Sequence, residues 1–236
     1  MHLLFDLDGT LANSRTGIVR CFQHALGALG VGIPADEALD RYIGSTLPIR
    51  ACFAELLGTT DATLADRAVA LYRGRFETVG MFENVLYPGT DDALAALSAR
   101  GHILHLVTAK PLVYAREIVR NFGIASYFTS VTGPGLDETR FTKAMLIRRA
   151  LVECRAITAN VVVIGDRAAD VDGARENGLP SIAVTWGYGD RAELEGADRT
   201  VDSWAALLAC LPPELASSAT APEHHGISAC DESSGR

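Results

Sequence analysis

The sequence predicts an α/β fold, a doubly wound parallel sheet with a small helical domain inserted after the first strand. Short apolar runs rich in β-branched residues alternate with amphipathic stretches, which is typical of parallel strands that helices cover on both faces. The interval between the first two runs is much longer than one crossover helix needs, and it has helical periodicity throughout. The runs are Leu3–Phe5, Ile103–Val107, Tyr127–Val131, Val161–Ile164 and Ile182–Val184.

The inserted segment is expected to contain four helices. Asn13 or Ser14 can cap the first, whose apolar residues recur at helical spacing until Gly30 ends it. The other three follow Pro34, span Leu47–Leu57 and span Asp61–Val79. We place the insertion at residues 14–82 and expect a small bundle that closes over the sheet as a lid.

The rest of the ordered chain, residues 1–13 and 83–213, forms the predicted sheet domain. Amphipathic segments such as Pro111–Phe122 and Lys143–Leu151 separate its later strands and should cover the sheet. The insertion would hinge near Ala12–Arg15 and Glu83–Leu86. After residue 213 the composition changes to Ser, Ala, Thr, Pro and Gly without apolar periodicity, so we expect residues 214–236 to form a disordered tail.

The composition of the 236-residue chain argues against several classes of protein. The formal net charge is −8 and the Lys and Arg residues are scattered, whereas binding a nucleic-acid polymer needs a basic patch. The five cysteines form no CxxC pair, which indicates reduced thiols rather than a zinc site or a disulfide framework. We find neither a secretory signal nor an apolar run of membrane-spanning length. We therefore expect a cytoplasmic protein that binds no membrane.

The first strand ends in the motif Asp6-Leu7-Asp8-Gly9-Thr10. Residues at i and i+2 share one face of a strand, so Asp6 and Asp8 should point the same way where the strand ends. Two close carboxylates repel each other unless a cation lies between them or one is protonated. The motif therefore favours Mg²⁺-assisted phosphoryl chemistry over the simpler interpretation, a surface turn that ends a strand.

Three further sets of residues fall at the same edge of the predicted sheet, where ligands bind in such folds. Thr108 ends the second strand, where its hydroxyl and the following N–H groups can hold a phosphate oxygen. Lys143 begins a helix, which is unfavourable for a cation unless an anion lies nearby. Asp166 and Asp170 lie four residues apart, on one face of the helix after the fourth strand, and destabilise it unless they share a cation. Each position alone also has a structural explanation. Thr108 could simply end a strand, Lys143 could be a solvated lysine, and Asp166 could cap the helix that follows it.

In this order and context, the four sets resemble the haloacid dehalogenase superfamily, specifically its phosphatases. The resemblance covers roughly Met1 to Leu211, and its most specific motif is the one that contains Asp6 and Asp8. It implies a Rossmann-like core, a helical cap after the first strand, and Mg²⁺-dependent hydrolysis of a small phosphorylated substrate.

The resemblance also implies a role for each residue of the site. Asp6 would be the nucleophile that forms an aspartyl phosphate, and Asp8 the general acid and then the general base. Asp6, the main-chain carbonyl of Asp8 and Asp166 would bind Mg²⁺, while Asp170 would hold a metal-bound water or orient Lys143. The phosphate group would be bound by Gly9, Thr108, Ala109 and Lys143.

The substrate is less well defined by these motifs. Thr108–Pro111, Gly165–Arg167 and Thr185–Gly189 look more like the 5′-nucleotidase-like subgroup. Lys143 is not followed by the proline common in phosphoglycolate phosphatases of this branch. A nucleoside monophosphate is therefore slightly favoured over phosphoglycolate. The candidate substrate contacts are Gly44, Ser45 and Arg50 of the cap and Lys110 of the core.

Other functions stay open. A phosphomutase resembling β-phosphoglucomutase shares the aspartate pair and a similar cap. A dehalogenase would have no task for Asp8, because cleavage of a C–Cl bond needs no proton on the leaving group. A non-catalytic binding module would be expected to lack one of the residues Asp6, Asp8, Lys143 and Asp166, and all four are present. The sequence leaves open whether the chain is a monomer or a homodimer.

Overall fold

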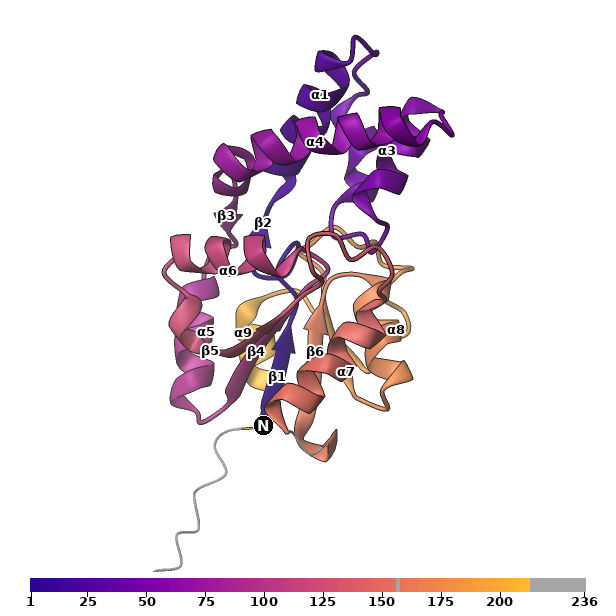
Figure 1. Ribbon diagram of the computed structural model, residues 1–236. Coiled ribbons are helices and arrows are strands. Elements are labelled where there is room, and N and C mark those ends of the chain that lie inside the picture. The colour runs from indigo at the N-terminus through magenta and orange to yellow at the C-terminus, as the bar shows by residue number, and fades with distance from the viewer. Residues whose placement is uncertain (156–157, 213–236) are drawn as a thin grey trace, which may run out of the picture.

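A six-stranded parallel sheet forms the centre of the structure, a computed structural model that describes residues 1–155 and 158–212 (Figure 1). Its strands are β1 (His2–Phe5), β4 (Ile103–Val107), β5 (Phe128–Thr132), β6 (Val161–Gly165), β7 (Ser181–Val184) and β8 (Arg199–Val201). They lie in the order β5-β4-β1-β6-β7-β8, and every neighbouring pair is parallel. The predicted α/β fold with a parallel sheet is confirmed.

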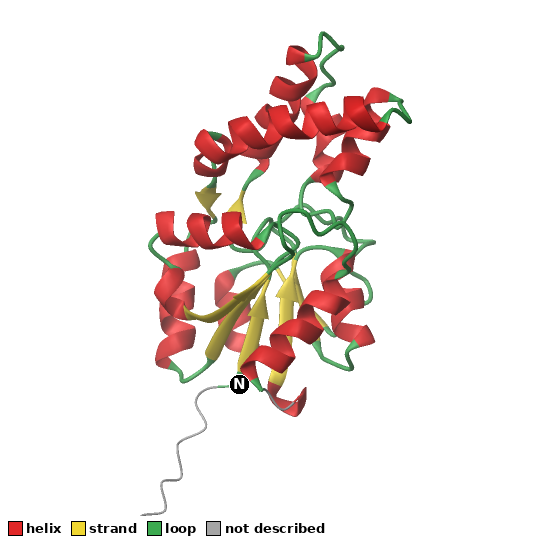
Figure 2. Cartoon of the chain, in the orientation of Figure 1, coloured by secondary structure: helices red, strands yellow, loops and turns green. Residues whose placement is uncertain are grey.

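Helices cover both faces of this sheet, as in Figure 2. They are α5 (Thr90–Ala99), α6 (Leu112–Asn121), α7 (Lys143–Cys154), α8 (Ala168–Glu176) and α9 (Trp204–Cys210), with short 3₁₀ turns η3 (Ala125–Tyr127) and η4 (Thr158–Asn160). Side chains alternate between the two faces of a strand. In β1, Leu4 therefore packs with residues of α7 and α8, while Leu3 and Phe5 pack with residues of α5, α6 and α9.

Residues 14–82, inserted between β1 and β4, form a layer of helices beyond the carboxyl ends of the strands (Figure 1). It contains α1 (Arg15–Ala28), α2 (Asp36–Leu39), η1 (Asp40–Tyr42), α3 (Ile49–Leu57), α4 (Ala62–Thr78) and η2 (Gly80–Phe82), and we refer to residues 14–82 as the cap. Aromatic rings pack at its centre: the Phe22 ring lies 5.5, 5.1 and 5.0 Å from the rings of Tyr42, Phe53 and Tyr72. These contacts give the cap a hydrophobic centre of its own.

The two segments that enter and leave the cap pair with each other. Strands β2 (Ala12–Asn13) and β3 (Val85–Leu86) form a short antiparallel ribbon, so the two predicted hinges lie side by side. Ser14 occupies the N-cap position of α1 without a side-chain capping bond, whereas the Asn13 side chain accepts a hydrogen bond from the Arg15 N–H (3.1 Å). Gly30 follows the end of α1 with a φ of 71°, which glycine adopts readily.

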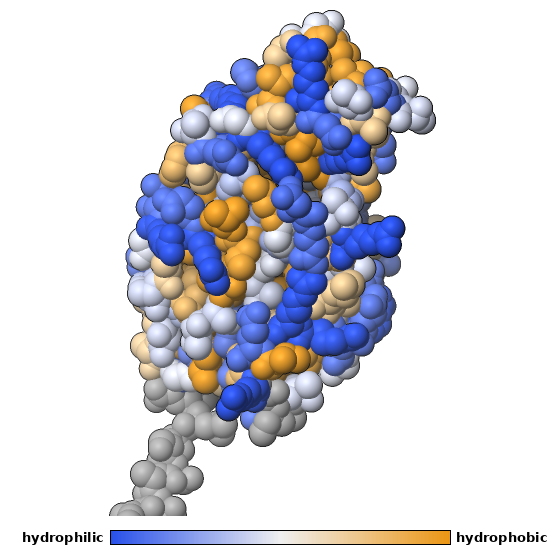
Figure 3. Space-filling model, in the orientation of Figure 1, coloured by the Kyte–Doolittle hydropathy of each residue, from blue (hydrophilic) through white to orange (hydrophobic). Residues whose placement is uncertain are grey.

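The sequence did not predict β8, α5 or α9. Strand β8 has three residues and only Val201 is buried, so it carries too little apolar pattern to be detected. The expected tail, residues 214–236, lies outside the described residues. Among the described residues, no helix combines the length and the hydropathy that crossing a membrane requires. On the face shown in Figure 3, hydrophobic residues form small separate patches among hydrophilic ones.

Candidate active site

The Asp6 carboxylate lies just beyond β1, next to the ammonium group of Lys143. Oδ1 of Asp6 is 2.6 Å from Lys143 Nζ, and Oδ1 of Asp170 is 2.7 Å from the same nitrogen. Lys143 is the first residue of α7, whose N-cap residue Thr142 accepts a hydrogen bond from the Met145 N–H. The helix therefore begins where its first side chain can reach two carboxylates, which explains a cation at a helix N-terminus.

Asp166 follows β6 and is held by the loops around it. Its carboxylate accepts hydrogen bonds from the Thr10 hydroxyl (3.2 Å) and the Tyr188 backbone N–H (2.8 Å). Gly9 and Gly187 pack against it so closely that a Cβ on either would lie 2.0–2.4 Å from Asp166 atoms. Both glycines are thus required by the close approach of the backbone to this carboxylate.

The prediction that Asp166 and Asp170 share one face of a helix is wrong. Helix α8 begins at Ala168 and its N-cap is Arg167, so Asp166 precedes the helix and does not cap it. Asp170 instead takes part in the capping of α8, where its Oδ2 accepts a hydrogen bond from the Arg167 N–H (3.1 Å). The two carboxylates still meet, because the turn between β6 and α8 brings them to the same edge of the sheet.

Asp6, Asp166 and Asp170 form a buried acidic cluster beside the ammonium group of Lys143. Burial raises the pKa of Asp6 to about 7, although Lys143 opposes this shift, and it raises the pKa of Asp166 well above its usual range. Burial lowers the pKa of Lys143, but Asp170 and Asp6 outweigh that effect and the pKa is raised. The ionised cluster therefore carries more negative charge than Lys143 can balance.

These three carboxylates are suited to a divalent cation. One oxygen atom from each of them lies within 4.8 Å of the other two. Oxygen ligands at about 2.1 Å from Mg²⁺ lie roughly 3 Å apart when adjacent and roughly 4 Å apart when opposite. Hard carboxylate oxygens are also the protein ligands that Mg²⁺ prefers. The side chain of Asp8 does not belong to the cluster, and the sequence analysis expected only its main-chain carbonyl at the metal.

Asp8 instead forms an ion pair with Lys110. Oδ2 of Asp8 is 2.9 Å from Lys110 Nζ, and both side chains are buried. The Lys110 ammonium also lies 5.0 Å from the centre of the Phe76 ring in α4, within the range of a cation–π contact. Oδ1 of Asp8 is buried and has no hydrogen-bond partner in the described part of the chain. Asp8 is therefore separated from the acidic cluster and faces the cap.

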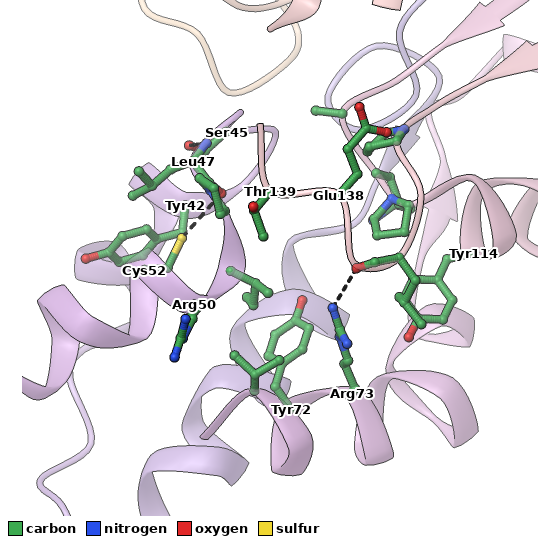
Figure 4. Close-up of a pocket in the computed structure, with 18 of the residues that line it drawn as sticks. Tyr42, Ser45, Leu47, Arg50, Cys52, Tyr72, Arg73, Tyr114, Glu138 and Thr139 are labelled. Carbon is green, nitrogen blue, oxygen red and sulfur yellow. Dashed lines mark hydrogen bonds between the residues drawn. The ribbon is translucent and has the colours of Figure 1, made fainter. Parts of the chain in front are cut away.

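A cavity of about 360 Å³ lies between the cap and the sheet, as shown in Figure 4. Its floor contains Asp6, Asp8 and Thr108, and the loop of residues 134–139 forms part of its wall. The cap contributes a largely aromatic and aliphatic surface with two arginines, from Ile18, Phe22, Tyr42, Ile49, Arg50, Tyr72, Arg73 and Phe76. Arg73 joins the two parts, since its guanidinium donates to the Leu136 carbonyl (2.7 Å).

Most of the predicted site residues converge on this cavity. The cavity is lined by Asp6, Asp8, Gly44, Ser45, Arg50, Thr108, Ala109 and Lys110. The Thr108 hydroxyl accepts a hydrogen bond from the Lys110 N–H (3.1 Å). The Arg50 side chain is paired with Asp66 (2.7 Å), so it is not a free cation in this conformation. Lys143, Asp166 and Asp170 lie beneath the floor, in the acidic cluster.

Two contributions to the site could not be predicted from the sequence. The Tyr188 N–H holds Asp166, and the Tyr188 hydroxyl contacts the N–H groups of Ser14 (2.7 Å) and Arg15 (3.1 Å) at the entrance to the cap. Only the two glycines of Trp186-Gly187-Tyr188-Gly189 signal such a close approach. The loop 134–139 was missed as well, because it follows a strand without any motif.

The chain resembles characterised proteins along most of its length. Residues 3–184 match the family model of the haloacid dehalogenase-like hydrolases. The chain is 40% identical to a 5′-nucleotidase of Pseudomonas aeruginosa over 216 residues, covering 92% of this chain and 96% of the relative. It is 34% identical over 208 residues to the tyrosine-protein kinase PtkA of Mycobacterium tuberculosis (87% and 69% covered). It is 30% identical over 226 residues to a phosphoglycolate phosphatase of Agrobacterium fabrum (92% and 95% covered).

Solved structures give the same assignment. A predicted phosphatase from Clostridium acetobutylicum has a TM-score of 0.80 and 36% identity, with 87% of this chain and 95% of that chain covered. The chain therefore belongs to the haloacid dehalogenase-like hydrolase family. Within that family it is a phosphatase, as its similarity to the 5′-nucleotidase, the phosphoglycolate phosphatase and the solved phosphatase structure indicates.

Proposed function

We propose that this enzyme hydrolyses the phosphate monoester of a small metabolite, with Mg²⁺ and through an aspartyl phosphate on Asp6. The observation that carries the proposal is the position of Asp6. Its carboxylate lies at the floor of the cavity, 2.6 Å from Lys143 and within the acidic cluster. A nucleophilic carboxylate must stay ionised in a buried place, and a neighbouring ammonium and a metal ion favour the ionised form.

Residues of the cavity floor and of the acidic cluster beneath it divide the chemistry between them. Asp6 attacks phosphorus in line, while the Thr108 hydroxyl, the Ala109 N–H and Lys143 bind the equatorial oxygens, whose negative charge must be balanced in the transition state. Gly9, which has no side chain, lets the phosphoryl group approach the backbone. Asp8 donates a proton to the leaving oxygen and later takes one from the hydrolytic water.

Asp6, Asp166 and Asp170 are the residues that would hold Mg²⁺. When bound, the ion would supply electrostatic stabilisation of the transferring phosphoryl group and would reduce its repulsion of the attacking carboxylate. Since the Asp8 side chain faces Lys110, we assign to Asp8 only its main-chain carbonyl as a metal ligand. Asp170 also contacts Lys143 (2.7 Å), so we assign to it the orientation of that lysine as well.

We infer that the substrate is a nucleoside monophosphate. The cavity is larger than a glycolate group needs, and aromatic side chains such as Tyr42 and Tyr72 line it (Figure 4). Stacking on an aromatic side chain is worth about 1–3 kcal/mol per base. The identity of 40% to a 5′-nucleotidase supports the same substrate class.

Two other activities are alternatives to the hydrolysis of a nucleoside monophosphate, and the substrate panel described below tests both. Phosphoglycolate is the second candidate, favoured by the relative with 30% identity. A phosphomutase would transfer the phosphoryl group to a second sugar hydroxyl rather than to water. A non-catalytic module is disfavoured because the four residues that it would be expected to lose in part are all present: Asp6, Asp8, Lys143 and Asp166.

We further propose that the cap acts as a lid. It lies over the catalytic floor, and the ribbon of β2 and β3 offers two short adjacent segments that can absorb a hinge motion. Arg73 would latch it in the closed form through the carbonyl of Leu136. The substrate would be a small molecule, and neither a nucleic-acid polymer nor a membrane enters the proposal.

The experiment measures kcat/KM for a panel of phosphate esters, with and without Mg²⁺. The panel contains nucleoside monophosphates, phosphoglycolate, sugar phosphates and p-nitrophenyl phosphate. We expect Mg²⁺-dependent release of phosphate, with a nucleoside monophosphate at least tenfold ahead of phosphoglycolate.

A variant of the cap tests the substrate assignment directly. Tyr72→Leu keeps an apolar side chain but removes the ring, so it should lower kcat/KM for nucleotides about 5- to 150-fold. The Asp6→Asn variant, which should not hydrolyse p-nitrophenyl phosphate, serves as the inactive control. A preference for phosphoglycolate that Tyr72→Leu leaves unchanged would contradict the substrate assignment.

A further inference from the structure

A second cluster of metal-binding residues lies at the amino end of the sheet, remote from the catalytic floor. His2 begins β1, His105 lies in the middle of β4, and Cys154 ends α7. One ligand atom from each of the three lies within 4.8 Å of the other two. His2 and Asp6 are four residues apart on an extended strand, so the two clusters are separated by about 13 Å along β1.

The imidazole rings of the two histidines are already positioned. They stack with an interplanar angle of 12° and centroids 5.2 Å apart, and His2 Nδ1 is 2.9 Å from His105 Nε2. His105 is fully buried in the sheet, and its Nδ1 is 2.8 Å from the Ser130 hydroxyl. When Nδ1 donates to this hydroxyl, Nε2 carries a lone pair directed at His2, as in the outer-shell contacts that orient metal-binding histidines.

Cys154 completes the cluster from the helix that covers this face. Leu4, which lies on the same face of β1 as His2, packs with residues of α7. The thiol is half-buried and makes a long, weak hydrogen bond to the Leu151 carbonyl (3.7 Å). It is therefore free to turn toward the two rings.

We propose that His2, His105 and Cys154 bind a borderline-soft divalent metal ion, preferably Zn²⁺, with water as the fourth ligand. Two imidazoles and one thiolate are ligands that Zn²⁺ prefers, whereas Mg²⁺ prefers the oxygen ligands of the acidic cluster. In a tetrahedral zinc site the ligand atoms lie about 3.3–3.8 Å apart. His2 Nδ1 and His105 Nε2, which are 2.9 Å apart, would therefore separate slightly, and the thiol, within 4.8 Å of the ligand atom of each ring, would approach by at most about 1 Å. His2 and Cys154 are only partly buried, and this leaves them room to move and admits water.

Such an ion would tie together the three elements that carry the catalytic residues at their opposite ends. Strand β1 leads to Asp6, β4 leads to Thr108, and α7 begins at Lys143, about 17 Å from Cys154 along the helix axis. The metal would fix these elements relative to one another without contacting the substrate. The expected effect is on the stability of the sheet domain rather than on the chemistry.

The spacing of the ligands in the sequence gives no sign of this site. Zinc motifs are recognised by pairs of ligands a few residues apart. Here the ligands come from two strands and one helix that are adjacent only in the folded sheet. His105 pairs with Leu4, which lies two residues from His2 on the same face of β1. The absence of a CxxC pair therefore does not exclude a zinc site.

Cobalt spectroscopy tests the proposal on the full-length, tag-free protein. The chain is treated with a chelator, saturated with Mg²⁺ to fill the acidic cluster, and titrated with Co²⁺. We expect a thiolate-to-cobalt charge-transfer band that saturates at one equivalent and disappears when Zn²⁺ is added. Zn²⁺ should also raise the Tm of the chelator-treated protein, because it binds the folded chain.

Variants distinguish this site from other cysteines and histidines. Cys154→Ser should abolish the band, and Ser130→Ala should weaken Co²⁺ binding about 10- to 100-fold, as for other outer-shell contacts of metal sites. Cys210→Ser is the matched control, since Cys210 is also a half-buried thiol at the end of a helix, and it should leave the band unchanged. Circular dichroism and thermal unfolding show whether each variant is folded.

Three outcomes would overturn the proposal. The first is the lack of a charge-transfer band in the folded wild-type protein. The second is a band that persists in Cys154→Ser. The third is a band lost when His224, His225 and Cys230 are all substituted while Cys154 is intact, because the metal would then be bound by residues 224–230.

Discussion

The environment of Lys143 leads to a prediction about stability as well as activity. Its ammonium lies 2.6 and 2.7 Å from Asp6 and Asp170, and all three side chains are nearly inaccessible to solvent. Removing one partner of a buried ion pair costs about 3–5 kcal/mol, because the other charge is left uncompensated. We therefore expect Lys143→Met to lower the free energy of unfolding by about that amount in the absence of Mg²⁺.

Mg²⁺ should restore part of this loss. Without the ammonium, the acidic cluster attracts a divalent cation more strongly, and a tenfold gain in affinity corresponds to about 1.4 kcal/mol at saturation. The assay is urea unfolding followed by circular dichroism, with and without Mg²⁺. We expect the difference in the free energy of unfolding between the variant and the wild type to be smaller in Mg²⁺ by more than about 1 kcal/mol. Lys143→Met/Asp170→Asn, which removes one carboxylate as well, should be more stable than the single variant without Mg²⁺. The reasoning is refuted if Lys143→Met unfolds like the wild type in both conditions.

The other predictions concern catalysis, metal binding and pH. Asp6→Asn should eliminate turnover of p-nitrophenyl phosphate while circular dichroism shows an intact fold; substantial remaining kcat would show that Asp6 is not the nucleophile. Asp166→Ala should raise the Mg²⁺ concentration needed for half-maximal activity at least tenfold, and an unchanged metal titration would contradict its role as a ligand. Burial lowers the pKa of His105 to about 4, so the unfolded chain binds a proton between pH 6.5 and 4 that the folded chain does not. In EDTA, the free energy of unfolding should therefore decrease as the pH falls through this range, with a contribution of up to about 3 kcal/mol from His105. The decrease should be smaller in His105→Gln, which lacks the titrating group. Equal pH dependence of the two proteins by urea unfolding would count against this.

The strands were predictable because each buried strand leaves a direct trace in the sequence. A run such as Val161–Ile164 is apolar on both faces, which in a soluble domain indicates a parallel strand between two layers of helices. Strand β8 leaves no such trace, because Arg199 and Thr200 are exposed at the edge of the sheet. The edge strand depends on its pairing with β7 rather than on its own hydrophobicity.

The catalytic edge was predictable for a related reason. The carboxyl ends of parallel strands meet at one edge, so polar residues that follow apolar runs were expected to converge. Asp6, Thr108 and Asp166 do so. The contact of the Tyr188 N–H with Asp166 could not be predicted, because a backbone donor is present at every residue except proline and has no sequence signature.

The separation of Asp8 from the acidic cluster explains how two aspartates only two residues apart can differ in task. A carboxylate that donates a proton must be allowed to take one up, while a nucleophile must stay ionised. The two requirements conflict if both side chains face the same cation. Asp6 points to Lys143 and the acidic cluster, whereas Asp8 points to Lys110 and, beyond it, to Phe76 of the cap. Lys110 contacts both Asp8 and the cap. A substrate that displaces the Lys110 ammonium would therefore free the Asp8 carboxylate from its ion pair when the leaving group binds against the cap. In the proposed mechanism, the cap would therefore affect the proton transfer as well as the choice of substrate.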